Sequence, residues 1–175
     1  RISTRWCFIL EEIWLSPSLP TKQYPFDKRS DGVPYHRNFR KIGFNETHAE
    51  ALCFLELLDI PTIGNKSDNK NLFYELTSLP HLKYIDDLIT GGGNKLFYVP
   101  GGVLNDMARL KKEHNVFTWL DQEKGKGKPF VKSINGNKIQ QIYHFSSTQT
   151  HSQAGAIYLT ANHWLEKTNL QYESP

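Results

Sequence analysis

Residues 47–86 constrain the fold of this chain more than any other stretch. They open with THAEALCFLELLDIP, in which Thr47 and Glu50 have the spacing of a capping box. Apolar residues then recur at helical spacing, at Ala51, Leu52, Leu55 and Leu58, until Pro61 ends the run. The pattern predicts a helix over residues 47–60.

The second half of this stretch predicts a strand, a helix and a second strand. Residues 61–65 are short, with Ile63 as their main apolar member, which favours a brief strand. Ser67 or Asp68 is placed to cap a helix. Its buried face would consist of Leu72, Leu76 and Leu79. Pro80 ends that pattern, and the alternation over residues 81–86 predicts a strand.

One more strand is expected near the start of the chain. Residues 6–15, WCFILEEIWL, are rich in aromatic and β-branched residues and end at the turn-forming sequence SPSLP. The resulting β-α-β-α-β order predicts an α+β fold. It consists of a three-stranded antiparallel sheet with both helices on one face, a ferredoxin-like half, in a domain of residues 1–87.

The rest of the chain is interpreted as extensions. Residues 16–44 are expected to form a basic loop inserted in the first domain, and residues 88–175 a partly structured C-terminal extension. The latter contains a helical pattern over 104–113 and a strand pattern over 138–145, whereas 154–165 fits a helix or a strand. The hydrophobic fraction, 38%, is low for one compact domain and fits this interpretation.

Basic residues are unevenly placed in this chain of net charge +3. The run KGKGKP at 124–129, flanked by Trp119 and Phe130, suits a backbone that follows phosphates while aromatic rings stack on bases. The alternative is a solvated loop. The candidate RNA-binding residues are Arg5, Lys22, Lys28, Arg29, Arg37, Arg40, Lys41, Lys124, Lys126 and Lys128.

These elements resemble the L-thirty family of large-subunit ribosomal proteins, and especially its mitochondrial members. The matching positions are Leu55, Leu57 and Leu58 at the end of the first helix, Asp68 at the second cap, Leu72, Leu76 and Leu79 on the second helix, and His81 and Leu82 entering the last strand. The chain departs from the family at Leu58, Asp59 and Tyr74, where the family has glycine, a basic residue and glycine.

The resemblance implies a structural constituent of the large ribosomal subunit in the mitochondrial matrix. Its partners would be large-subunit ribosomal RNA and neighbouring ribosomal proteins, with no catalysis, cofactor, metal or small-molecule substrate. The acid-poor residues 1–5 are compatible with the tail of an organellar presequence. No apolar run approaches about 18 residues, so we expect no membrane span.

Two other classes of function remain open. A small metal-dependent nuclease would use Asp86, Asp87 or Asp106, with His144 as general base, and a protein-binding adaptor would spread its basic residues evenly. Other motifs are incomplete. Gly91 to Gly93 lack the Gly-Lys-Ser/Thr ending of a phosphate-binding loop, Ser146, Ser147 and His151 lack a nucleophile elbow, and His144, His151 and His163 lack further metal ligands.

Cys7 and Cys53 are the two cysteines of the chain. Cys53 falls on the apolar side of the predicted helix over 47–60. We therefore expect no disulfide framework, and the cysteine content fits a reducing compartment.

Overall fold

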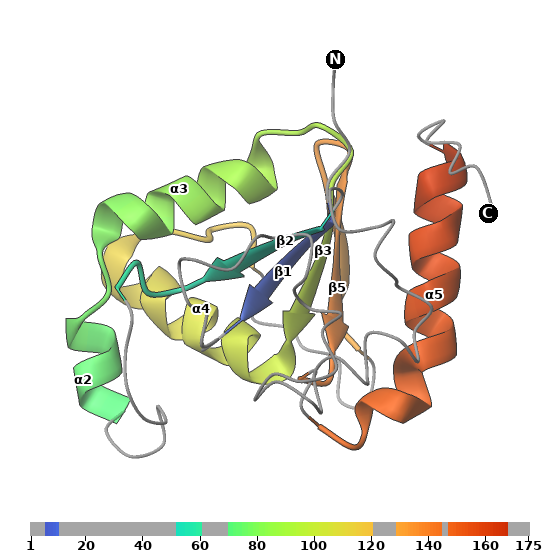
Figure 1. Cartoon of the computed structure of the whole chain (residues 1–175). Coiled ribbons are helices and arrows are strands. Elements are labelled where there is room, and N and C mark those ends of the chain that lie inside the picture. Colours follow the sequence, from blue (N-terminus) through green and yellow to red (C-terminus); the bar gives the residue numbers. More distant parts are fainter. Residues whose placement is uncertain (1–5, 11–51, 61–69, 121–128, 145–146, 168–175) are drawn as a thin grey trace.

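A computed structural model describes residues 6–10, 52–60, 70–120, 129–144 and 147–167. Its centre is a five-stranded mixed sheet with the strand order β2-β1-β3-β5-β4 (Figure 1). The strands are β1 (Trp6–Leu10), β2 (Leu52–Glu56), β3 (Leu96–Pro100), β4 (Val131–Ile134) and β5 (Asn137–Ile142). The pairs β1 with β2, β1 with β3 and β3 with β5 are parallel, and β4 pairs antiparallel with β5.

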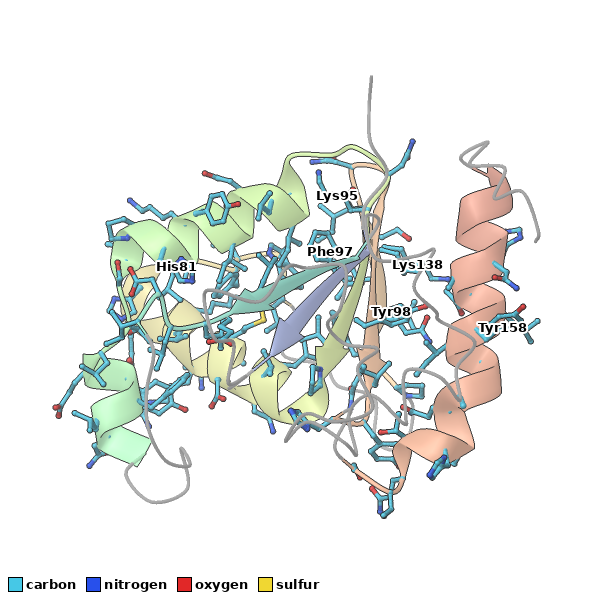
Figure 2. All side chains as sticks on the ribbon, viewed as in Figure 1. His81, Lys95, Phe97, Tyr98, Lys138 and Tyr158 are labelled. Carbon is cyan, nitrogen blue, oxygen red and sulfur yellow. The ribbon has the colours of Figure 1, made fainter. Side chains whose placement is uncertain are left out.

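Helices cover both faces of this sheet. They are α2 (Lys70–Glu75), α3 (Leu79–Thr90), α4 (Gly101–His114) and α5 (Thr150–Lys167). Figure 1 shows α3 and α4 on one side of the strands and α5 on the other. Figure 2 shows Phe97 and Tyr98 of β3 pointing to these two sides. The described part of the chain is therefore built in three layers, helix on sheet on helix.

Strand β3 explains why helices are needed on both faces. All five of its residues, LFYVP, are buried. Phe97 and Val99 belong to the core formed with α3 and α4, whereas the hydroxyl of Tyr98 donates a hydrogen bond of 2.9 Å to the carbonyl of Ile157 in α5. A continuous apolar run of this kind is typical of a central parallel strand buried on both faces.

The predicted helix over residues 47–60 is wrong where the structure describes it, because residues 52–56 form β2. Leu55, Leu57 and Leu58 are buried there. The run LCFLELL is apolar on both sides, and such a run fits a buried strand as well as a helix. Parallel pairing with β1 decides between the two.

The predicted strand over residues 81–86 is also wrong, because these residues lie in α3. The buried residues of α3 are Leu82, Ile85 and Ile89, at helical spacing, whereas Tyr84 is 54% exposed. Pro80 lies in the first turn of α3, where its missing N–H costs no helical hydrogen bond. Pro80 therefore begins a helix and does not end one.

The sheet itself differs from the predicted three-stranded antiparallel sheet with helices on one face. It has five strands, is mostly parallel, and joins strands from both sides of residue 87. The combination of helices with a sheet is confirmed, as are the strand at residues 6–10, the helix over 104–113 in α4 and the strand over 138–142 in β5. A second helix is present as α2, but its predicted buried face is wrong, because Leu72 is exposed, Leu79 is exposed and lies in α3, and Phe73 is the buried residue of α2. Residues 154–165 are helical, in α5. The loop 16–44 and the predicted strand 61–65 lie outside the described residues.

Asn137 holds the amino edge of the sheet together. It is fully buried, its Oδ1 accepts a hydrogen bond of 2.8 Å from the Lys95 N–H, and its Nδ2 donates to the carbonyls of Ile89 at 2.8 Å and Leu88 at 3.4 Å. The preceding Asn135 and Gly136 have φ angles of 48° and 86°, as a tight hairpin turn between β4 and β5 requires. One side chain thus connects the end of α3 with β3 and β5.

We predict that Asn137→Ala lowers the free energy of unfolding by about 2–4 kcal/mol, because it removes a fully buried amide and its buried and part-buried hydrogen bonds to backbone groups of three residues. Urea denaturation measures this loss. Asn71→Ala is the matched control, since Asn71 is exposed on α2, and it should change stability by less than about 0.5 kcal/mol. Equal effects of the two substitutions would contradict the role given to Asn137.

Candidate functional site

The carboxyl edge of the sheet is where the fold brings strand ends and helix starts together. Strands β1, β3 and β5 run parallel and end at this edge, and both α4 and α5 begin there (Figure 1). Strand β1 has β2 on one side and β3 on the other, so the order of connections reverses between β1 and β3. In open α/β sheets, ligands bind outside the carboxyl ends of the strands at such a switch point.

Helix α4 begins at this edge with residues that leave its backbone accessible. Its N-cap is Pro100, which makes no side-chain capping hydrogen bond, and the first turn contains no acidic residue. Gly101 and Gly102 follow, and Gly102 is exposed. The first N–H groups of an α-helix have no partner inside the helix, and here no capping side chain substitutes for one.

Gln141 of β5 lies beside this turn. A Cβ atom on Gly101 would lie 2.8 Å from the Gln141 Nε2. The Oε1 of the same amide accepts a hydrogen bond of 3.2 Å from the Phe130 N–H. This hydrogen bond orients the amide, and its NH₂ group is placed next to the start of α4.

The segment after β5 fixes the start of a second helix, α5, at the same edge. The carbonyl of His144 accepts hydrogen bonds from the Ser147 N–H at 2.8 Å and from the Thr150 hydroxyl at 2.7 Å. Thr150 is the first residue of α5 and is 1% exposed. Burial lowers the pKa of the His144 imidazole below its ordinary value, which favours the neutral ring at neutral pH.

These groups favour an anion over a cation. Two helix N-termini carry partial positive charge, and neither first turn contains an acidic residue. Backbone N–H groups and a side-chain amide are donors of the kind that hold phosphate oxygens. Among the residues that the structure describes, no group of three or more His, Cys, Asp or Glu side chains is arranged to hold a metal ion.

The carboxylates of the nuclease alternative lie in separate places. Asp86 accepts hydrogen bonds from the Phe117 N–H at 3.0 Å and from the Trp119 indole at 2.8 Å, which fixes the segment after α4. Asp87 is exposed on α3, and Asp106 is bound to Tyr74. The structure does not bring these aspartates together with His144 as ligands of one metal.

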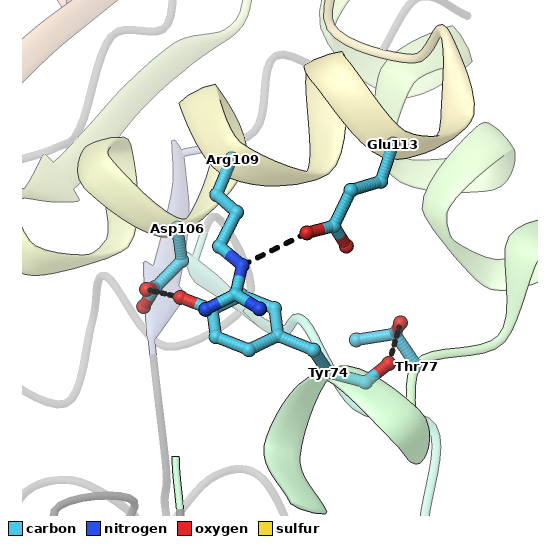
Figure 3. Close-up of polar contacts among 5 residues, drawn as sticks. All are labelled: Tyr74, Thr77, Asp106, Arg109 and Glu113. Carbon is cyan, nitrogen blue, oxygen red and sulfur yellow. Dashed lines mark hydrogen bonds and ion pairs between the residues drawn. The ribbon is translucent and has the colours of Figure 1, made fainter. Parts of the chain in front are cut away.

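Asp106 belongs to a polar cluster that joins α2 to α4 (Figure 3). The Tyr74 hydroxyl donates a hydrogen bond of 2.6 Å to its Oδ1, and the Arg109 guanidinium lies 3.6 Å from the centre of the Tyr74 ring. Arg109 also forms an ion pair of 2.9 Å with Glu113. Burial, together with the Asp106 carboxylate, raises the pKa of Tyr74 to about 12. This cluster positions α2 on the core.

The ten basic residues predicted to bind RNA all lie outside the described residues. The aromatic residues that flank the run at 124–129 are described. Trp119 and Phe130 are both partly buried and pack against the hydrophobic core. That these two rings stack on bases stays a prediction.

Sequence reasoning missed the groups at the start of α4. A signal was present, since the apolar run LFYV is followed directly by Pro100, Gly101 and Gly102 and then by a helical pattern. The three glycines at 91–93 instead lie between α3 and β3, at the amino end of that parallel strand. Gly92 and Gly93 have φ angles of 78° and 99°, so they serve the turn there.

Comparison with protein-family models, with curated proteins and with solved structures gave no match to this chain. The resemblance to the L-thirty ribosomal family stays a prediction. Its matched residues Leu55 and Leu57 lie in and just after β2, and His81 and Leu82 lie in α3. Within the described ranges, none of the helices has the length and apolar character that crossing a membrane requires.

We predict that Tyr74→Phe destabilises the protein by about 1–3 kcal/mol at neutral pH, because the buried Asp106 carboxylate loses a hydrogen-bond donor. The folded-state pKa of Tyr74 is raised above its unfolded value of 10.0 to about 12. Its contribution is therefore present below pH 10 and is lost as the pH rises through 12.

The measurement is the difference in unfolding free energy between wild type and this variant, which should shrink from pH 9 to pH 12. Tyr84→Phe is the matched control, because Tyr84 lies exposed on α3 and should contribute little. A Tyr74→Phe effect that stays constant up to pH 12 would exclude ionisation of this hydroxyl as the cause.

Proposed function

We propose that this protein binds a phosphate-bearing small molecule, of the nucleotide class, at the carboxyl edge of its sheet between β1 and β3. The observation that carries the proposal is the start of α4, where Gly101 and Gly102 follow β3 at the switch point of the sheet. Nucleotide sites on parallel sheets use this position, which is an argument from the fold.

The local geometry supports the same proposal. Glycines allow the backbone to approach phosphate oxygens closely, and the uncapped N–H groups of α4 would donate to them. The Gln141 amide lies against Gly101 and supplies a further donor. The start of α5 adds partial positive charge at the same edge.

Gly102→Asp tests this site sharply. A carboxylate in the first turn interacts favourably with the helix dipole, so the variant should fold with wild-type stability. The same charge repels a phosphate, so the dissociation constant should rise at least about tenfold. Isothermal titration calorimetry with ATP, AMP and NAD⁺ measures binding, and the neutral Gly102→Asn is the matched control of similar size.

Three results decide the proposal. Binding of at least one probe by wild type and Gly102→Asn, with weak binding by Gly102→Asp, supports it. The proposal fails if none of the three probes binds at millimolar concentration to wild type. It also fails if Gly102→Asp binds as tightly as Gly102→Asn, because the bound phosphate would then lie elsewhere.

The second candidate function is the one that the sequence favours, a structural ribosomal protein that binds large-subunit RNA in mitochondria. Its support is the set of ten basic residues and the run KGKGKP. Lysines placed against phosphates release counterions, so such binding would weaken steeply with salt. Co-sedimentation of the native protein with large ribosomal particles, lost on magnesium chelation, would support this function.

We predict that the double substitution Lys124→Ala with Lys126→Ala weakens binding to a single-stranded RNA and lowers the slope of log affinity against log salt by about 1.4. Filter binding at several salt concentrations measures the slope. Lys83→Ala with Lys112→Ala is the matched control, since both lysines are exposed on described helices. An equal effect of both pairs would point to nonspecific attraction of RNA by the whole protein.

A further inference from the structure

The two cysteines of this chain are brought together by the pairing of β1 with β2. Cys7 lies in β1 and Cys53 in β2, far apart in the sequence. In the parallel register of these strands their Cα atoms are direct partners. The predicted helix over 47–60 gave no reason to expect this, because Cys53 would then have lain in a different kind of element.

The two residues lie on the same face of the sheet. Register partners in neighbouring strands project to the same side, and successive residues alternate between sides. Cys7 is also the partner of Phe97 in β3, and Phe97 is the partner of Ile139 in β5. Phe97 and Ile139 are fully buried in the core that includes α3 and α4. The backbone positions of the two cysteines continue this row of register partners across the sheet.

The spacing of the strands fits a disulfide bond. Neighbouring strands lie about 4.7–4.9 Å apart. The Cα atoms of a disulfide are usually about 4.4–6.8 Å apart. Because Cys7 and Cys53 are register partners, the usual spacing of paired strands puts their Cα atoms within the range that a disulfide allows.

We propose that Cys7 and Cys53 form a reversible disulfide when the protein meets a peroxide. One thiolate attacks a peroxide oxygen and becomes a sulfenic acid, with release of the first water. The second thiol attacks that sulfur, the S–S bond forms and the second water leaves. Two electrons pass from the two sulfurs to hydrogen peroxide, and a dithiol reductant reverses the reaction.

This bond would close residues 7–53 into a covalent ring. The ring contains six of the basic residues predicted to bind RNA, namely Lys22, Lys28, Arg29, Arg37, Arg40 and Lys41. It would also tie β2, which pairs with a single described strand, to β1. In a reducing compartment a disulfide of this kind is typically transient and responds to redox conditions. The proposal does not depend on the nucleotide site.

The test is oxidation of the full chain with hydrogen peroxide, followed by alkylation of free thiols, non-reducing proteolysis and mass spectrometry. We expect a peptide containing Cys7 linked to one containing Cys53 within a single chain, and its loss after treatment with dithiothreitol. The proposal is overturned if both thiols are recovered alkylated, if they are oxidised singly, or if the link joins two chains.

Stability provides a second readout. Closing a long ring restricts the unfolded chain, so oxidised wild type should melt roughly 5 °C or more above the reduced protein. Cys7→Ser and Cys53→Ser should melt at the same temperature with and without peroxide. A similar rise in either variant would assign the effect to another oxidation and would overturn the proposal.

Discussion

The parallel pairing of β3 with β1 and β5 is the interaction on which the rest of this fold depends. β3 has a hydrogen-bonded neighbour on each side, and all five of its residues are buried. Because a parallel connection must cross over one face of the sheet, helices are needed to cover it. The pairing therefore determines both the layers of the molecule and the edge at which strands end and helices begin.

Helix α4 shows how the core and the candidate site are linked. Val103, Leu104, Met107 and Leu110 are buried on one side of it and hold the helix against the sheet. Its first turn consequently stays at the end of β3, beside the switch point, with no capping side chain on its first N–H groups. The hydrophobic core thus places a polar backbone feature that no single side chain could provide.

Elements with an unambiguous period could be predicted from the sequence, and those with a continuous apolar run could not. The helix around Met107 and the strand around Ile139 were identified, since each has one buried face. Leu52 to Leu58 is apolar on both sides, and the choice of strand depends on pairing with residues 6–10, a contact far away in the sequence. The candidate site was missed for the same reason, because it exists where strands β1 and β3 become neighbours.

The hydrogen bond from Tyr98 to the Ile157 carbonyl has a consequence for the far layer. Apolar contacts alone would let a helix rotate or slide on a sheet at little cost, whereas a directed bond to one carbonyl selects one rotational and one axial position. Successive carbonyls along a helix differ by about 100° and 1.5 Å. The hydrogen bond from Tyr98 therefore fixes the rotation of α5 about its axis. That rotation determines which residues of α5 face outward, and the exposed Leu159 is one of them.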